Sequence, residues 1–134
     1  MDDFSIVIKT RFNDVLANAI LDSGAGASVM DLGTFESLKL EQTLENSNDI
    51  LHDASGNEMN IVGIAKIKVH VAGTNTDIVH DFRILNSRSY RNVILGRDLM
   101  KKFKVVTFDF KSNVISLDGR RVKGVTSPSK RLPV

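Results

Sequence analysis

The sequence of 134 residues contains no Cys or Trp, one Tyr and two Pro. Without Cys there is no disulfide framework and no thiolate chemistry, and the chain suits a reducing compartment. No apolar run approaches the roughly 20 residues of a membrane-spanning helix. The first residues, Met1-Asp2-Asp3-Phe4, are acidic where a signal peptide would be basic. We therefore expect a cytoplasmic protein without a membrane span.

A strong charge of one sign is also lacking, although the pI is close to 9.0. The formal net charge is +2, and residues 120–134 contain five Lys or Arg and no Asp or Glu. The 119 residues before them carry 13 basic and 16 acidic side chains. Because this body is slightly acidic, the pI does not indicate a nucleic-acid-binding domain. We interpret residues 1–119 as one domain and residues 120–134 as a basic, flexible tail.

Most of the remaining signal is typical of β-strands. In residues 66–71 apolar side chains alternate with Lys and His, which is the period-two pattern of a half-buried strand. Helical signal is weak: residues 98–103 are the best candidate, and residues 33–38 favour a single helical turn. The sequence therefore predicts an all-β fold. Its further strands are expected at residues 4–9, 15–21, 78–85, 106–110 and 114–117.

Two short apolar segments, Ala19-Ile20-Leu21 and Val93-Ile94-Leu95, run directly into glycine-containing turns. A strand without a polar face is buried on both sides. We therefore expect these segments to form a central pair of strands, with a turn delivered at the end of each.

The first of these turns, residues 22–28 (Asp-Ser-Gly-Ala-Gly-Ala-Ser), is the most unusual stretch of the chain. Taken alone, Asp-Ser-Gly is a common turn sequence. The Gly-x-Gly within it begins a dinucleotide-binding fingerprint, but Val29 replaces the third glycine and no adequate helix follows. A phosphate loop would need Gly-Lys-Ser/Thr, and a nucleophile elbow around Ser28 would need glycine at Met30. The three His residues show no metal-ligand spacing, so we expect neither cofactor nor metal.

Together with two later elements, this turn resembles the retropepsin-like aspartic proteases. The matching segments are Leu21-Asp22-Ser23-Gly24-Ala25 for the catalytic loop, Ile94-Leu95-Gly96-Arg97-Asp98-Leu99 for the second element, and the hairpin Asp53-Ala54-Ser55-Gly56-Asn57 for the flap. They occur in family order over about residues 4–118, in a style most similar to Ty3/Gypsy-type retrotransposon proteases. The resemblance implies a closed β-barrel with a flap hairpin and one short C-terminal helix.

The resemblance also implies that Asp22 is one of two catalytic carboxylates that share a proton. The chain contains no second Asp-Thr/Ser-Gly, because Asp118-Gly119 lacks the intervening hydroxyl residue. The second carboxylate must then come from another copy of the chain. We therefore expect an obligate two-fold homodimer that acts on peptide substrates.

Roles for the neighbours of Asp22 follow from the same resemblance. Ser23 and Gly24 are expected to complete the catalytic loop. Substrate binding is expected of Ile20, Ala25, Gly26, Ala27, Val29, Ala54, Ser55, Gly56, Asn57 and Ile94, and support of the loop is expected of Ser28, Gly96, Arg97 and Asp98. Retroviral enzymes carry acidic residues where this chain has Gly26 and Ala27, so Arg97 lacks its usual partner. Asp98 and Asp31 are the candidates to replace it.

Three functions remain open at this point. The first is processing of a retroelement Gag-Pol polyprotein, in the cytoplasm or within virus-like particles. The second is the equivalent domain of a cellular ubiquitin-shuttle protein of the DNA-damage-inducible type. The third is a catalytically retired dimerisation or binding module, against which the intact Asp22-Ser23-Gly24-Ala25 argues.

Overall fold

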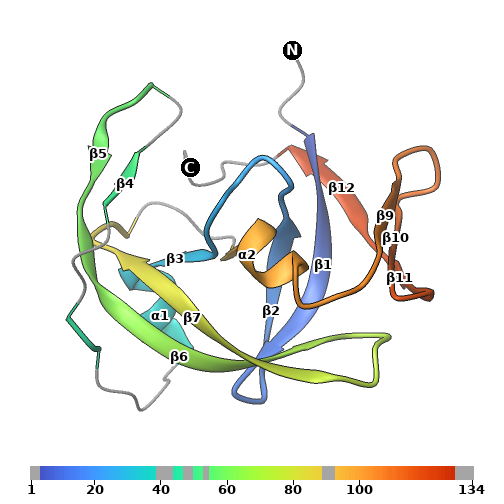
Figure 1. The fold of residues 1–134 in the computed structure, drawn as a ribbon, viewed down its shortest axis with the longest axis horizontal. Helices are drawn as coiled ribbons and strands as arrows, with labels where there is room; N and C mark the ends of the chain where they lie inside the picture. The colour runs from blue at the N-terminus through green and yellow to red at the C-terminus, as the bar shows by residue number, and fades with distance from the viewer. Residues whose placement is uncertain (1–3, 39–43, 47–49, 53–54, 89–92, 129–134) are drawn as a thin grey trace.

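Figure 1 shows the computed structural model of the chain, which describes residues 4–38, 44–46, 50–52, 55–88 and 93–128. None of the helices within these ranges is long and apolar enough to cross a membrane. The elements in chain order are β1 (Phe4–Phe12), β2 (Val15–Leu21), β3 (Val29–Asp31), α1 (Leu32–Ser37), β4 (Leu51–His52), β5 (Glu58–Met59), β6 (Ile61–Val71), β7 (Asp77–Leu85), β8 (Val93–Leu95), α2 (Arg97–Met100), β9 (Val106–Asp109), β10 (Val114–Leu117), β11 (Arg120–Lys123) and β12 (Val125–Pro128).

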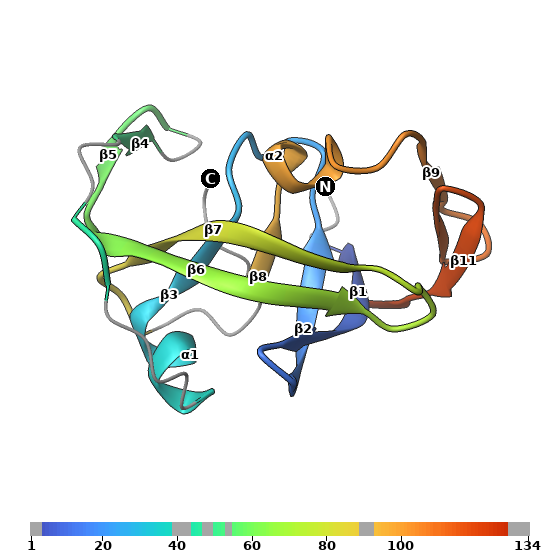
Figure 2. The ribbon, with the colours of Figure 1, turned by 60° about the horizontal axis from the view of Figure 1, so that its bottom comes forward.

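Six of these strands close into a barrel. Their order is β1-β2-β8-β3-β7-β6, and β6 returns to pair with β1 through Thr10–Phe12 and Val69–Val71. In Figure 2 the long antiparallel pair β6 and β7 crosses in front of β3, β8 and β2. The barrel confirms the predicted all-β fold and its closed form.

Alternating side chains fill the barrel. On β6 the apolar residues Ile67, Val69 and Val71 are buried, and the Lys and His residues between them are more exposed, as the period-two pattern predicts. Phe12 and Phe82 meet edge to face at the centre, with ring centroids 5.8 Å apart. Each such fully buried side chain contributes about 1.5–3 kcal/mol relative to an exposed one.

The two apolar strands form the expected central pair. β2 and β8 run parallel, with Ile20 opposite Ile94, and both strands are buried at this point. Because the strands are parallel, their carboxyl ends meet at the same end of the barrel. The turn after β2 and the turn after β8 are thereby brought together.

Several short elements differ from the sequence-based expectation. β3 was not predicted, since its three residues are too few to show a pattern. It leads into α1, whose N-terminus is capped by the Asp31 carboxylate, 2.7 Å from the amide nitrogen of Thr34. α2, at Arg97–Met100, is the expected C-terminal helix, although it begins and ends earlier than residues 98–103.

The expected flexible tail is wrong for residues 120–128. Residues 120–123 form β11 on the sheet β9-β10-β11, and residues 125–128 form β12, which pairs with the first half of β1. The physical reason is the apolar side chain of Val122, which lies opposite Ile115 and is only 4% exposed. The tail was predicted from the basic charges of residues 120–134 and their two prolines, although the segment also contains β-branched residues. Residues 129–134 lie outside the described residues.

The ordered state of β11 can be tested with a matched pair of substitutions. We expect Val122→Ala to lower the free energy of unfolding by about 1–2.5 kcal/mol, because it removes buried methyl groups and leaves a cavity. Val105→Ala is the control, since Val105 lies in the same region but is 57% exposed. Urea denaturation of both variants measures the difference. Equal stabilities would mean that residues 120–123 form a flexible tail after all.

Candidate active site

The loop of residues 22–28 leaves β2, enters β3 and lies against the turn between β8 and α2. The amide of Asp22 donates to the carbonyl of Leu95 at 2.9 Å, and the amide of Arg97 donates to the carbonyl of Ala25 at 2.8 Å. Figures 1 and 2 both place this loop beside α2 at one end of the barrel. The backbone of the loop is therefore fixed by residues about 70 positions away in the sequence.

The predicted catalytic residues lie on the outer side of this loop. The half-exposed carboxylate of Asp22 accepts a hydrogen bond from the amide of Gly24, at 2.9 Å. A Cβ on Gly24 would lie 3.2 Å from that carboxylate oxygen, so glycine permits the close approach. Ser23 and Gly24 are exposed at the tip, and Ala25 is buried beneath them. The loop thus presents one carboxylate outward on a fixed backbone.

The inner side of the loop is held by Ser28 and Asp98. Ser28 is fully buried; its hydroxyl donates to Asp98 Oδ1 at 2.7 Å, and its amide donates to Asp98 Oδ2 at 3.1 Å. The same hydroxyl oxygen accepts from the amide of Gly96 at 3.0 Å. These contacts place Ser28, Gly96 and Asp98 together behind the loop, where the sequence analysis expected supporting residues.

Asp98 is kept ionised by its donors. Burial raises the pKa of this carboxyl group, but hydrogen bonds from His80 and Ser28 outweigh that effect and lower the pKa to about 2. His80 Nε2 lies 2.9 Å from Asp98 Oδ2. The sequence alone assigned His80 no role, because the three His residues show no metal-ligand spacing. The sequence pattern that could have shown its burial is the alternation of His80 with Phe82 and Ile84. These three residues occupy every second position and lie on the inner face of β7.

Arg97 is anchored by a carbonyl group. Its Nη1 donates to the carbonyl oxygen of Ser23 at 2.7 Å. Of the two acids considered as its partner, Asp98 accepts from Ser28 and His80, and Asp31 caps α1. Within its own chain Arg97 therefore stabilises the tip of the loop. Its ion pair with an acidic residue stays a prediction.

Three of the expected pocket residues are core residues in this chain. Ile20, Val29 and Ile94 are almost completely buried, in a cluster with Ala25 and Leu85 under the loop. The partly exposed side chains that pack over this cluster are Val7, Ala27, Leu51, Met59 and Ile61. The three residues thus lie in the core, with apolar residues of the flap and of β1 packed against them. Their contact with a substrate stays a prediction.

The flap is present as a short hairpin. β4 and β5 pair through Leu51 with Met59 and through His52 with Glu58. Ser55, Gly56 and Asn57 are exposed at its tip, where Gly56 has a φ of +87°, a conformation that favours glycine. Asp53 and Ala54 lie outside the described residues. Figures 1 and 2 place the hairpin at the same end of the barrel as the Asp22 loop.

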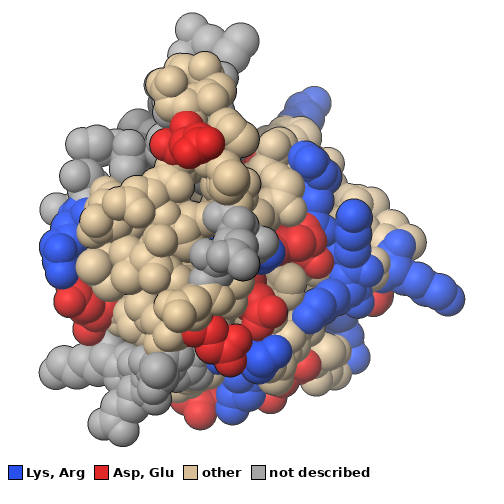
Figure 3. Space-filling view, turned by 60° about the vertical axis from the view of Figure 1, so that its left-hand side comes forward, with Lys and Arg blue, Asp and Glu red and all other residues tan. Residues whose placement is uncertain are grey.

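Figure 3 shows the surface on the flap side of the barrel. In Figure 3 much of this side is uncharged, and Lys and Arg gather along its right-hand edge.

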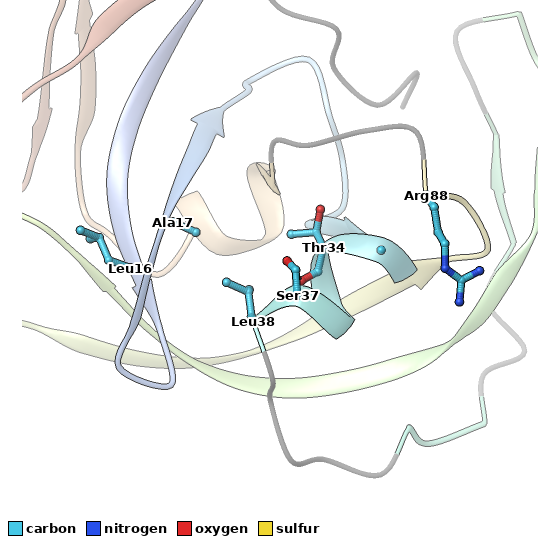
Figure 4. A pocket seen from close by; sticks show the side chains of 7 residues that line it. Leu16, Ala17, Thr34, Ser37, Leu38 and Arg88 are labelled. Carbon is cyan, nitrogen blue, oxygen red and sulfur yellow. The ribbon is translucent and has the colours of Figure 1, made fainter.

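A pocket of about 430 Å³ lies elsewhere, between α1 and the start of β2 (Figure 4). Its lining residues are Leu16, Ala17, Gly33, Thr34, Ser37, Leu38 and Arg88, none of which belongs to the predicted site. Among the described residues, no three His, Asp or Glu side chains converge as metal ligands would.

Comparisons with known proteins agree with this geometry. The sequence model of the family described as "Aspartyl protease" matches residues 4–108. The crystal structure of the retroviral protease-like domain of Ddi1 from Leishmania major has a TM-score of 0.65 and 24% identity, covering 90% of this chain and 96% of that chain. EIAV protease complexed with the inhibitor HBY-793 has a TM-score of 0.57 and 19% identity, covering 73% and 86%. No curated protein matches the sequence. These likenesses show a retropepsin-like fold.

The tight contact between the two turns can be tested at Gly96. A Cβ added there would lie 2.6 Å from the carbonyl oxygen of Ala27 and 2.9 Å from that of Ala25. We expect Gly96→Ala to lower the free energy of unfolding by about 1–3 kcal/mol, because the loop backbone must move. Gly26→Ala is the matched control: its Cβ would meet only the end of Arg97, at 3.4 Å. Thermal unfolding that gives the same midpoint for both variants would contradict this packing.

Proposed function

The chain belongs to the aspartyl protease family, and from this premise we propose that it is a homodimeric aspartic endopeptidase whose active site contains Asp22 from two copies. The observation that carries the proposal is the Asp22 loop itself. It presents a carboxylate at the end of the barrel, on a backbone held by Leu95 and Arg97, beside a hairpin with an exposed tip.

The proposed reaction is general acid–base hydrolysis. One Asp22 carboxylate removes a proton from a bound water molecule, whose oxygen attacks the carbonyl carbon of the peptide bond. The partner's Asp22, protonated at that moment, donates its proton to the carbonyl oxygen. The Asp22 that took the proton from water then gives it to the amine nitrogen as the C–N bond breaks. The other Asp22 takes a proton from a hydroxyl group of the tetrahedral intermediate, so that one proton is again shared by the pair. The two carboxylates titrate as a pair, so the apparent pKa values belong to both.

The requirement for two copies follows from the single Asp-Ser-Gly of the sequence. Asp118, in the only other comparable position, serves as a turn residue: its φ is +50° and its Oδ1 accepts from the amide of Val105 at 2.8 Å. A two-fold axis next to the Asp22 loop would bring two equivalent carboxylates together. A single copy would hold only one.

The proposed substrate is an extended peptide lying between the loop and the flap. Ser55–Asn57 at the flap tip would pair with its backbone as an added strand. Its apolar side chains would rest on Val7, Leu51, Met59 and Ile61, which pack against the buried cluster under the loop. We propose a retroelement Gag-Pol polyprotein as the natural substrate, processed in the cytoplasm or in virus-like particles, because the segment 94–99 and the flap resemble Ty3/Gypsy-type enzymes.

Catalysis by Asp22 predicts a clear difference between two isosteric substitutions. Asp22→Asn should reduce peptide cleavage by about 10²–10⁴-fold or more, since an amide cannot accept the proton from water. Asp118→Asn is the control and should cleave like the wild type, because its amide oxygen can still accept from Val105 and Asn tolerates a positive φ. Both are measured with a peptide library, which also reports the sequence preference. Full activity in Asp22→Asn would rule out the mechanism, and a wild-type chain that cleaves nothing would favour the retired module.

If two copies share one active site, an inactive variant should inhibit the wild-type chain by forming mixed dimers with it. A ninefold excess of Asp22→Asn should lower the activity per wild-type chain by about tenfold once subunits exchange, because most wild-type chains then sit in mixed dimers. The same excess of Asp118→Asn should not inhibit. Sedimentation velocity at the assay concentration reports the dimer directly. Activity from a species that sediments only as a monomer would refute the shared site.

A further inference from the structure

Behind the Asp22 loop, side chains from three parts of the chain converge on one carboxylate. Asp98, at the start of α2, accepts from Ser28 at the end of the loop and from His80 on β7. The amide of Leu99 also donates to it, at 2.8 Å, and the guanidinium group of Arg83 lies 3.7 Å away. The His80 side chain is only 8% exposed. Buried polar groups in such a network hold one another in place when every donor has its acceptor.

The geometry fixes the role of His80 in this network. Asp98 is ionised at all but very low pH, so both of its oxygens are acceptors. His80 Nε2, 2.9 Å from Oδ2, must therefore carry a proton and donate it. The imidazole does so in its neutral form as well as in its charged form. Its ring also packs edge to face on Phe82, with centroids 5.7 Å apart, which fixes the ring orientation in the core.

The network is connected to the catalytic loop by Ser28. Its amide and hydroxyl both donate to Asp98, and its hydroxyl oxygen accepts from the amide of Gly96. The hydrogen bond between Gly96 and Ser28 thus joins the end of the Asp22 loop to the turn after β8. The same turn holds the beginning of the loop, because Leu95 accepts from the amide of Asp22. A change in the position or charge of Asp98 would therefore affect the hydrogen bonds at both ends of the loop.

We propose that His80 is a positioning residue for the catalytic loop: by donating to Asp98 it holds Ser28 and Gly96, and so orients Asp22 toward its equivalent in the second copy. This inference rests on the proposed function, since it assumes that Asp22 is catalytic. His80 lies behind the loop and acts only through Asp98 and Ser28. Displacements of about 1 Å in catalytic geometry can change rates up to a hundredfold.

The network also has a consequence for pH dependence. The charged groups facing Asp98 are His80 and Arg83 from β7; on α2 itself, Arg97 turns to the carbonyl of Ser23. Without the donor of His80, burial would raise the pKa of Asp98 toward the acidic range in which a pair of aspartates works. The carboxylate would then be protonated, and the loop loosened, at a higher pH than in the wild type.

The test compares His80→Leu, which removes the donor, with His80→Gln, whose amide can place an N–H near the position of Nε2. We expect His80→Leu to lower kcat about tenfold or more with little change in KM, and to move the acidic limb of the pH–rate profile upward by about half a pH unit or more. His80→Gln should restore most of kcat and the wild-type limb. His70→Leu is the matched control, since His70 makes an equivalent contact to Asp77, at 2.8 Å, on the exposed part of β6 and β7.

Wild-type kcat and an unshifted acidic limb in His80→Leu would overturn the inference, and so would a His80→Gln variant as impaired as His80→Leu. Either result leaves the proposed function intact while Asp22→Asn stays inactive.

If the wild type cleaves nothing, the proposed function fails. The contact between His80 and Asp98 is then tested by measuring the stability of the folded state against pH. Ionised Asp98 stabilises the folded state above its ordinary pKa of 3.8, and this is lost as pH falls toward 2. His80→Leu should show that loss at higher pH than the wild type, and coincident curves would overturn the inference.

Discussion

The parallel pairing of β2 with β8 is the constraint on which the rest of the site depends. Because residues 19–21 of β2 and all of β8 are apolar and buried on both faces, they lie in the centre of the sheet. Because the two strands are parallel, both of their turns emerge at the same end. Asp22 and Gly96 are thereby neighbours in space although they are far apart in sequence. Gly96 has no side chain, which lets the two backbones touch and exchange hydrogen bonds. The exposed loop is thereby held by backbone hydrogen bonds to the turn after β8.

This constraint also explains how much of the molecule could be predicted from its sequence. The bounds of β2, the alternation on β6 and the pairing of β9 with β10 follow from patterns within a few residues. The features that were missed depend on partners far along the chain, on a length too short for a pattern, or, for β11, on a segment whose basic charge suggested a tail. β12 pairs with β1 from the other end of the sequence, and β3 is too short to show a pattern. Periodicity places His80 on the inner face of β7, but it cannot reveal that Asp98 lies opposite.

The apolar residues near the site show a related division of roles. Sequence resemblance assigns Ile20, Val29 and Ile94 to substrate pockets, and the structure places all three in the core. Burial of each contributes about 1.5–3 kcal/mol, which is a large share of the net stability of a small domain. Side chains so deeply packed support the loop above them. Leu51 and Met59 at the base of the flap are partly exposed, so they can contact a ligand without weakening the core.

The two aspartates of the candidate site lie in different environments, and the proposed mechanism asks different things of them. A catalytic carboxylate must exchange a proton at mildly acidic pH, which requires that a second carboxylate come close and that few donors stabilise its charge. A supporting carboxylate must keep its charge through that range, since protonation would remove an acceptor from the network. Asp98 meets this requirement because Ser28 and His80 donate to it and lower its pKa to about 2. Asp22, half-exposed on the outer side of the loop, has a backbone donor in Gly24 and a surface that another copy can reach. The same short loop therefore lies between Asp22 on its outer side and a supporting carboxylate, Asp98, that its hydrogen-bond donors keep ionised.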